Sequence, residues 1–383
     1  MTRWGVVLAI WCAGLGAAGQ YAKVSIIFSQ LDDVYPLPPG TLAFAVSLVG
    51  VVGILLGIVA ARIVAAVGYR RTMVWCLWLG AAISAAQWMA PAFSVFLALR
   101  VIEGVSHLGL VVAAPTLIAQ LSSDRARGFT MTLWSTFFGV TFTLLAWLGL
   151  PLVERAGVLS LFAAHAIYMA VLATALQVVL KSVAKLPSEP MPTLRSLPGL
   201  HAQIYASPWK NAPAAGWLFY TICFLAILTV IPPYIDPSWR AFVLGSMPLV
   251  SIAVSMTLGV AMLRHVTAVT VVQIGFLACA AASLWLWVKP GDPVACLALA
   301  AALGLVQGAS FAAIPQLNTS ATDRAEASGA LAQAGNLGNT LGTPLLVLVL
   351  SLGGFNAMAL TVLLLFLGGF AIHAVLAKAR HQF

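Results

Sequence analysis

The chain has 383 residues, of which 62% are hydrophobic and only 8% are charged, and its mean hydropathy is +1.02. Because about a quarter of the residues of a soluble protein are charged, this composition excludes a soluble protein and indicates an integral, multi-pass membrane protein. The formal net charge is +9, but the basic residues fall in short gaps between apolar runs and form no stripe with interleaved aromatic residues. This distribution favours the lipid bilayer as a partner and argues against nucleic acid.

Twelve apolar runs follow one another along the chain, each of about the 20 residues that a membrane-spanning helix needs. They are expected at 5–28, 41–66, 72–90, 94–120, 129–150, 157–180, 213–233, 240–262, 266–288, 294–320, 329–352 and 356–377. The first run is too long for a cleaved signal peptide. The sequence therefore predicts an all-α membrane protein with twelve transmembrane helices.

One break is much longer than the others and divides these helices into two sets of six. It covers residues 181–212 and is rich in proline, serine and basic residues (KSVAKLPSEPMPTLRSLPG). The predicted organisation is an N-terminal six-helix bundle at 1–180, a cytoplasmic linker at 181–212 and a C-terminal six-helix bundle at 213–383.

The lysines and arginines predict the orientation in the membrane. With the N-terminus inside, 14 fall on the cytoplasmic side and only Arg155, Arg240 and Lys289 on the other, while Lys23 and Arg100 remain within spans. Such an excess is the positive-inside pattern, so both termini are expected in the cytoplasm. The low charge and abundant alanine favour a bacterial inner membrane.

Two of the first four predicted helices carry charges inside the membrane. On the fourth, Arg100, Glu103, Gly104 and His107 share an arc of roughly 100° and form a polar stripe about 10 Å long. A charge near the bilayer centre costs at least about 2.5 kcal/mol, so the stripe must face protein or a water-filled cavity. Lys23, on the first helix, either faces the same cavity or extends its ammonium group to the outer interface.

Polar residues on the later helices are more isolated. His165 on the sixth helix stands alone among apolar residues, which favours a structural role. Tyr220 on the seventh and Gln307 on the tenth lie near the predicted mid-membrane level, where they contact either substrate or a neighbouring helix. The five cysteines lie unpaired inside apolar runs, and no cluster of His, Cys or carboxylate residues has metal-ligand spacing. We therefore expect no metal, no cofactor and no enzymatic activity.

The two halves of the sequence repeat each other at an offset near 200 residues. Asp124-Arg125-Ala126 matches Asp323-Arg324-Ala325, the pair Gly57 and Arg62 matches Gly259 and Arg264, and Glu103-Gly104 matches Gln307-Gly308. Three pairs in one order indicate an ancient duplication of a six-helix unit, as in one class of transporters.

Together with two motifs, this organisation resembles the major facilitator superfamily over nearly the whole chain. GIVAARIVAAVGYRR keeps Gly57, Arg62, Arg70 and Arg71 of the loop between helices 2 and 3, with Ala61 at the usual aspartate position, and Arg100-Val-Ile-Glu103-Gly104 matches the fourth-helix pattern. The resemblance implies that Gly57, Arg62, Arg70 and Arg71 act in gating. It also implies that helices 1, 4, 7 and 10 line a central cavity. The proline of the helix-5 antiporter pattern is missing.

The leading hypothesis is a secondary transporter that moves a small organic anion, such as a carboxylate, by alternating access. Lys23, Arg100, Tyr220 and Gln307 would bind the substrate, since two fixed cations face one carboxylate. Glu103 and His107 would couple transport to protons, in symport. The alternative is an efflux transporter for amphipathic or drug-like compounds, in which Arg100 and Glu103 form a structural ion pair.

Overall fold

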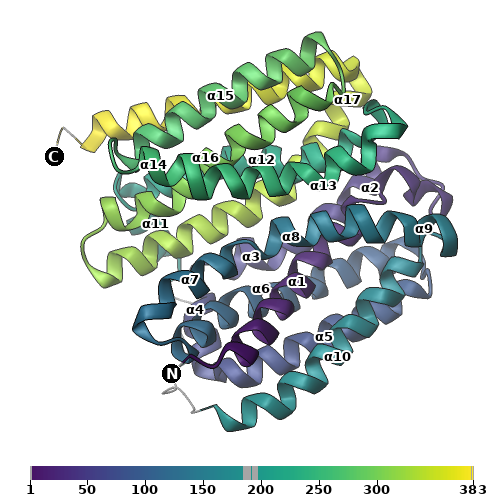
Figure 1. The fold of residues 1–383 in the computed structure, drawn as a ribbon, viewed down its shortest axis with the longest axis horizontal. Helices are drawn as coiled ribbons and strands as arrows, with labels where there is room; N and C mark the ends of the chain where they lie inside the picture. Colours follow the sequence, from purple (N-terminus) through teal and green to yellow (C-terminus); the bar gives the residue numbers. More distant parts are fainter. Residues whose placement is uncertain (1, 184–190, 192–196, 381, 383) are drawn as a thin grey trace. The chain divides into compact units, whose positions relative to one another are not determined.

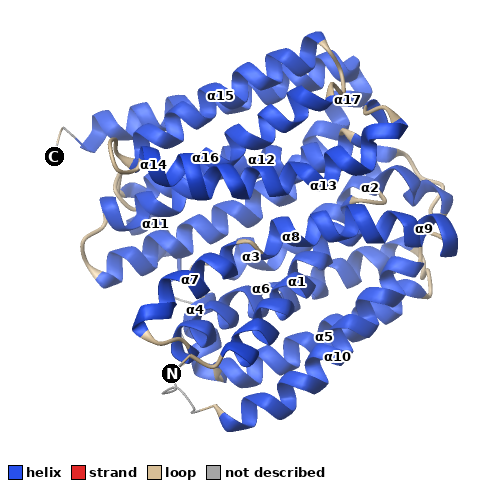
Figure 2. Ribbon diagram, in the orientation of Figure 1, coloured by secondary structure: helices blue, strands red, loops and turns tan. Residues whose placement is uncertain are grey.

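The computed structural model describes residues 2–183, 191, 197–380 and 382. The described residues form helices joined by turns and short loops, with no strand among them (Figure 2). Their backbone polar groups are therefore paired within helices, as a chain surrounded by lipid requires. The chain divides into two compact units, residues 1–37 with 48–193, and residues 38–47 with 194–383.

The first unit consists of helices that run back and forth (Figure 1). Its elements are α1 (Trp4–Ser25), η1 (Phe28–Asp33), η2 (Leu48–Gly50), α3 (Val51–Leu56), α4 (Ala60–Val67), α5 (Tyr69–Trp88), α6 (Phe93–Leu121), α7 (Asp124–Ser135), α8 (Phe137–Leu144), η3 (Leu145–Gly149), α9 (Leu150–Ala156), α10 (Ser160–Val179) and η4 (Leu180–Ser182). The predicted span 41–66 is thus interrupted, with 3-10 geometry at η2 and a turn at 57–59.

The second unit has fewer and longer elements. They are α2 (Pro39–Ser47), α11 (Leu197–Ala206), α12 (Asn211–Val230), η6 (Pro232–Tyr234), α13 (Pro237–Val254), η7 (Ser255–Gly259), α14 (Val260–Met262), α15 (Ala268–Val288), α16 (Pro293–Leu317) and α17 (Ala321–Arg380). Helix α11 falls within the predicted linker 181–212, and α2 packs against α17.

Ten helices within the described part of the chain are long and apolar enough to cross a membrane. The tenth covers two predicted spans, because α17 runs on past Gly354, where φ is +68° and the backbone turns sharply. The predicted span 72–90 corresponds to α5, which is not among the ten. The all-helical membrane architecture is confirmed, whereas twelve crossings and two cytoplasmic termini remain predictions.

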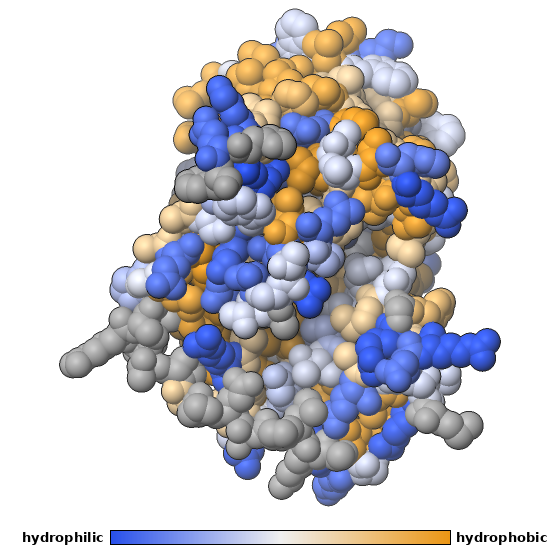
Figure 3. Space-filling model, turned by 90° about the vertical axis from the view of Figure 1, so that its left-hand side faces the viewer, coloured by the Kyte–Doolittle hydropathy of each residue, from blue (hydrophilic) through white to orange (hydrophobic). Residues whose placement is uncertain are grey.

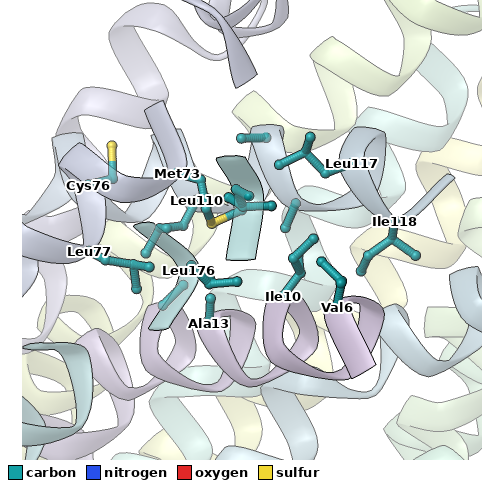
Figure 4. Packing of buried hydrophobic residues seen from close by; sticks show 14 of the residues in the cluster. Val6, Ile10, Ala13, Met73, Cys76, Leu77, Leu110, Leu117, Ile118 and Leu176 are labelled. Atoms are coloured by element: carbon teal, nitrogen blue, oxygen red, sulfur yellow. The ribbon is translucent and has the colours of Figure 1, made fainter. Parts of the chain in front are cut away.

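The apolar core of the first unit joins α1, α5, α6 and α10 (Figure 4). Ile10, Met73, Leu77, Leu110 and Leu176 are fully buried in it. Between helices in lipid, close van der Waals packing drives this association. Small residues on α1 allow it: a side chain added at Gly16 would collide with Met169, and one at Gly19 with His165.

The two units repeat one close contact, and it corrects the alignment of the halves. A side chain at Gly104 of α6 would collide with the carbonyl oxygen of Val49, and one at Gly304 of α16 with that of Ser251. These glycines are 200 positions apart, as are the first residues of α6 and α16. The predicted match of Glu103-Gly104 with Gln307-Gly308 is therefore wrong by one helical turn.

Polar and apolar surfaces are segregated. Figure 3 shows one face of the molecule on which hydrophilic side chains gather, with hydrophobic side chains beside and above them. Many large apolar side chains elsewhere are exposed, among them Leu55, Met89, Ile167, Leu148 and Leu352. Such exposure would be a liability in water, and lipid contact explains it.

Candidate functional site

The charged stripe on α6 lies inside the first unit. Arg100 and Glu103 are 0% exposed and His107 is 7% exposed. The guanidinium group of Arg100 donates to Oε2 of Glu103 one helical turn away. The sequence-based pairing of these two residues, with opposite charges at i and i+3, is therefore confirmed.

Lys23 of α1 completes an ionic cluster with these two residues. Its Nζ lies 2.6 Å from Oε1 of Glu103, and the residue is 1% exposed. The side chain is thus directed into the unit, and the alternative of an ammonium group at the outer interface is wrong. Helix α1 brings Lys23 there because it packs against α6 and because its glycines let α10 approach closely.

Helix α5 supplies neutral hydrogen-bonding groups to the cluster. Lys23 Nζ donates to Ser84 Oγ over 2.7 Å, and Gln87 Nε2 donates to Glu103 Oε2 over 3.0 Å. Both α5 side chains are fully buried. We did not predict either residue from the sequence, although a serine and a glutamine three positions apart in an apolar run were a usable signal.

His165 of α10 belongs to the same cluster, so the expectation that it stands alone among apolar residues is wrong. Its Nδ1 lies 2.7 Å from Ser84 Oγ and 3.5 Å from Lys23 Nζ, and its Nε2 lies 2.9 Å from the carbonyl oxygen of Gly16. One turn earlier on α10, the ring of Phe162 lies beneath the ammonium group of Lys23, 5.4 Å from Nζ to the centroid.

We call Lys23, Ser84, Gln87, Arg100, Glu103 and His165 the buried ionic cluster. It lies on the same four helices as the apolar core, after the core residues on α1 and α5 and before them on α6 and α10. Two cations face one carboxylate, which leaves an excess positive charge away from water. Breaking such an arrangement by removing the carboxylate costs about 3–5 kcal/mol, because it strands a buried charge.

His107 faces a different surface of α1. Its Nδ1 lies 2.9 Å from the carbonyl oxygen of Ala17, and its ring meets Tyr21 edge-on with centroids 5.0 Å apart. A carbonyl oxygen only accepts, so Nδ1 carries the proton and Nε2 of the neutral ring has its lone pair available. His107 can therefore accept a proton or a hydrogen bond at Nε2.

The candidate residues of the second unit form a separate, uncharged group. Tyr220 donates its hydroxyl to Gln307 Oε1 over 3.4 Å, and Ser251 donates to the same oxygen over 3.5 Å. The rings of Trp217, Tyr220 and Phe224 stack along α12, with centroids 4.4 and 5.3 Å apart. This group can offer aromatic surface and an amide, but it supplies no charge.

The predicted gating residues are spread over three elements. Gly57 directly follows α3, and Arg62 is exposed on α4. On α5, Arg70 donates to the carbonyl oxygen of Val183 over 2.7 Å, and the guanidinium group of Arg71 lies over the ring of Trp75. These contacts all lie within the first unit, and the role of the four residues in gating stays a prediction.

A further ion network, which we did not predict, ties the beginning of α12 to the beginning of α17. Lys210 Nζ lies 2.8 Å from Asp323 Oδ1 and 2.6 Å from Glu326 Oε2. The hydrogen bonds to Asp323 and Glu326 raise the pKa of Lys210. In the sequence, Asp323 stands in the repeated Asp-Arg-Ala motif.

No group of three or more His, Cys, Asp or Glu side chains that could hold a metal occurs among the described residues. The five cysteines are free thiols, four of them buried. The polar side chains described above interact through ion pairs and hydrogen bonds.

Comparisons with known proteins agree on one family. The family model of the Major Facilitator Superfamily matches residues 6–343. Two solved structures share the fold. The first is the human organic anion transporter MFSD10 (TETRAN), with 19% sequence identity and a TM-score of 0.62, and the match covers 96% of this chain and 98% of that one. The second is a bacterial homologue of the human lysosomal transporter Spinster in an inward-facing and occupied conformation, with 13% identity and a TM-score of 0.76, and the match covers 98% of this chain and 97% of that one. No curated protein matches the sequence. The chain belongs to the major facilitator superfamily and is a membrane transporter rather than an enzyme.

Proposed function

We propose that the protein carries a small organic anion across the membrane by alternating access, in symport with protons. The observation that carries this proposal is the buried ionic cluster, in which Lys23 and Arg100 share the single carboxylate of Glu103. An excess cation inside a membrane protein is costly, and a bound anion would neutralise it. The structural relative MFSD10 is described as an organic anion transporter, which adds support.

The cluster suggests how proton and anion would be coupled. Glu103 forms ion pairs with both Lys23 and Arg100, so a substrate carboxylate has to compete with Glu103 for these cations. Protonation of Glu103 would remove its negative charge and leave Lys23 and Arg100 for the substrate, the arginine as a bidentate partner and the lysine as a point charge. The proton and the anion would then bind together and leave together.

The remaining site residues would act around this exchange. His107 presents Nε2 as a second position for a proton. In the second unit, Tyr220 and Gln307 would contact the uncharged part of the substrate. Gly57, Arg62, Arg70 and Arg71 would act in gating, and the protein would reside in a bacterial inner membrane.

Transport into proteoliposomes tests this proposal. A panel of radiolabelled mono- and dicarboxylates is offered to the wild type and to the variants Glu103→Gln and Arg100→Gln, with and without a pH gradient. We expect uptake of at least one carboxylate driven by an inward proton gradient. In Glu103→Gln we expect transport to lose its pH dependence, and in Arg100→Gln to fall at least tenfold. Gradient-driven uptake that is unchanged in both variants would refute the assignment.

A second candidate function is export of amphipathic or drug-like compounds. The complete burial of Arg100 and Glu103 favours it, since a pair that never meets the substrate would serve only to hold α6. The second unit would then bind cargo through the stacked rings of Trp217, Tyr220 and Phe224. Drug sensitivity of a deletion strain, reversed equally by the wild type and by Arg100→Gln, would favour this function over anion uptake.

A further inference from the structure

His165 is tied to Lys23 by hydrogen bonds whose directions are fixed by chemistry. Nε2 of His165 lies 2.9 Å from the carbonyl oxygen of Gly16, and because that oxygen only accepts, Nε2 carries the proton. In the neutral ring Nδ1 then has a lone pair, which accepts the hydroxyl hydrogen of Ser84 over 2.7 Å.

The direction continues from Ser84 to Lys23. An ammonium group only donates, so Lys23 Nζ donates to Ser84 Oγ over 2.7 Å. The hydroxyl of Ser84 thus receives one hydrogen bond from Lys23 and passes one to His165. Both bonds are satisfied together only while His165 is neutral and protonated on Nε2.

We propose that His165 is a positioning residue for Lys23: through Ser84 it holds the ammonium group of Lys23 in place, and it does so only in the neutral form. The inference rests on the proposed function in one respect, since Lys23 is there the cation that receives the anion. When Glu103 is protonated and releases Lys23, Ser84 and His165 keep the ammonium group where the substrate carboxylate will meet it.

The charges around His165 explain why the neutral form matters. Three ionised groups act on His165, namely Lys23 of α1 and Arg100 and Glu103 of α6. The polar side chains of the neighbouring α5, Ser84 and Gln87, are neutral, as is Tyr168 of α10 itself, which donates to the carbonyl oxygen of Cys12. On α9, which packs against α10, Glu154 and Arg155 are exposed. Nδ1 of His165 lies 3.5 Å from Lys23 Nζ, so a proton there would place a second positive charge beside the ammonium group. It would also remove the acceptor for the hydroxyl hydrogen of Ser84, so the hydrogen-bonded path from Lys23 through Ser84 to His165 would be broken.

His107 provides an internal contrast. It donates from Nδ1 to Ala17, the residue next to Gly16, so the two histidines hold adjacent carbonyl oxygens of α1 through opposite ring nitrogens. The structure thus assigns the Nδ1–H form to His107 and the Nε2–H form to His165. Only His165 is bonded to the lysine.

Nuclear magnetic resonance on the purified full chain in lipid nanodiscs tests the proposal without any substrate. With ¹⁵N-labelled histidine and lysine at pH 7.5, we expect His165 in the Nε2–H form and His107 in the Nδ1–H form, assigned by single substitutions. The Lys23 ammonium signal should be protected from hydrogen exchange. That exchange should accelerate at least tenfold in Ser84→Ala and in His165→Leu, while His165→Asn, which keeps an acceptor near the position of Nδ1, should restore most of the protection.

The control is His373→Leu. His373 of α17 is also fully buried, but neither of its ring nitrogens has a hydrogen-bond partner among the described residues. Its loss should leave Lys23 exchange unchanged. An Nδ1–H form for His165 in the wild type, or Lys23 exchange within twofold of the wild type in Ser84→Ala, would overturn the inference. Because none of these measurements uses an anion, failure of the transport proposal would leave this result standing, and the reverse also holds.

Discussion

Helices α6 and α16 occupy equivalent places in the two units and use the same packing contact with different chemistry. Both press a glycine against a backbone carbonyl, Gly104 on Val49 and Gly304 on Ser251. At the corrected offset of 200, Arg100 corresponds to Ala300 and Glu103 to Leu303. His107 corresponds to Gln307, so of these three positions only this one is polar in both units.

The comparison shows that the architecture does not need buried charges. The second unit builds the same contact around alanine and leucine, both buried, while the first unit retains three ionised groups at a cost in free energy. Because the second unit forms this contact with apolar residues, the charged residues of the first unit are not needed for packing, which favours a role in transport. A second use of such ions is to select which helices pair, since buried polar groups can also specify a unique packing.

The largest effect is expected when only part of the cluster is removed. Glu103→Leu copies Leu303 but leaves Lys23 and Arg100 buried without their carboxylate. We expect destabilisation of about 3–5 kcal/mol, seen as a large loss of folded protein in detergent and a lower temperature of thermal unfolding.

The matched variant removes all three charges. Lys23→Met, Arg100→Ala and Glu103→Leu together make the first unit resemble the second, and we expect stability within about 1 kcal/mol of the wild type or above it, with transport abolished. If the triple variant were as unstable as Glu103→Leu alone, the charges would be structural and the comparison between the units would fail.

A smaller effect is expected from the two equivalent glycines. Gly104→Ala and Gly304→Ala each drive a methyl group into a backbone carbonyl that cannot move freely, so each should cost about 1–3 kcal/mol. Gly308→Ala should cost less, because it meets the Ser255 hydroxyl, which can rotate. Thermal unfolding of the three variants decides the alignment: a Gly308 cost that matches Gly104 while Gly304→Ala is harmless would restore the offset of 204.

The serines of α5 and α15 give a finer comparison. Ser84 and Ser283 lie 199 positions apart and both are buried, but Ser84 bonds across helices to Lys23, whereas Ser283 donates to the carbonyl oxygen of Cys279 on its own helix. Interhelical hydrogen bonds in membranes contribute about 0.6 kcal/mol and at most about 1.7. Ser84→Ala should therefore cost about 1 kcal/mol and Ser283→Ala close to none, as measured by unfolding in mixed detergent. If the two substitutions lowered the free energy of unfolding equally, the hydrogen bond between Ser84 and Lys23 would contribute no more to stability than the bond of Ser283 within its own helix.

These contrasts also mark what could be predicted from sequence. The helical membrane architecture followed from composition, because a chain in lipid has to pair its backbone within helices. The pairing of Arg100 with Glu103 followed from helical spacing within one element. Local periodicity was sufficient for both.

The rest of the cluster depends on which helices are neighbours. Lys23, Ser84 and His165 come from α1, α5 and α10, and no spacing along the chain links them, so His165 looked isolated in its apolar run. The interrupted second span was missed for a related reason, whereas the turn at Gly354 falls at the predicted break between the spans 329–352 and 356–377. Hydropathy averages over a window and does not register a local change in backbone geometry.

The smallest effect is expected at the ion network of the second unit. Lys210 bridges Asp323 and Glu326 and is 22% exposed. The corresponding Arg3 of the first unit donates instead to the backbone and hydroxyl of Ser182. Partly exposed ion pairs contribute about 0.2–1 kcal/mol, so Lys210→Met should cost about 0.5 kcal/mol, and Arg3→Met should cost no more.

Salt and pH identify the origin of that effect. Because the folded state raises the pKa of Lys210, its contribution should be complete below the ordinary lysine pKa of 10.5 and disappear as the pH rises through the raised value. It should also shrink between 0.05 and 1 M salt, over which the screening length falls to about 3 Å. Thermal unfolding of Lys210→Met and Arg3→Met across this range is the measurement. Salt-independent loss in Lys210→Met would mean that the lysine acts by packing rather than by its charge.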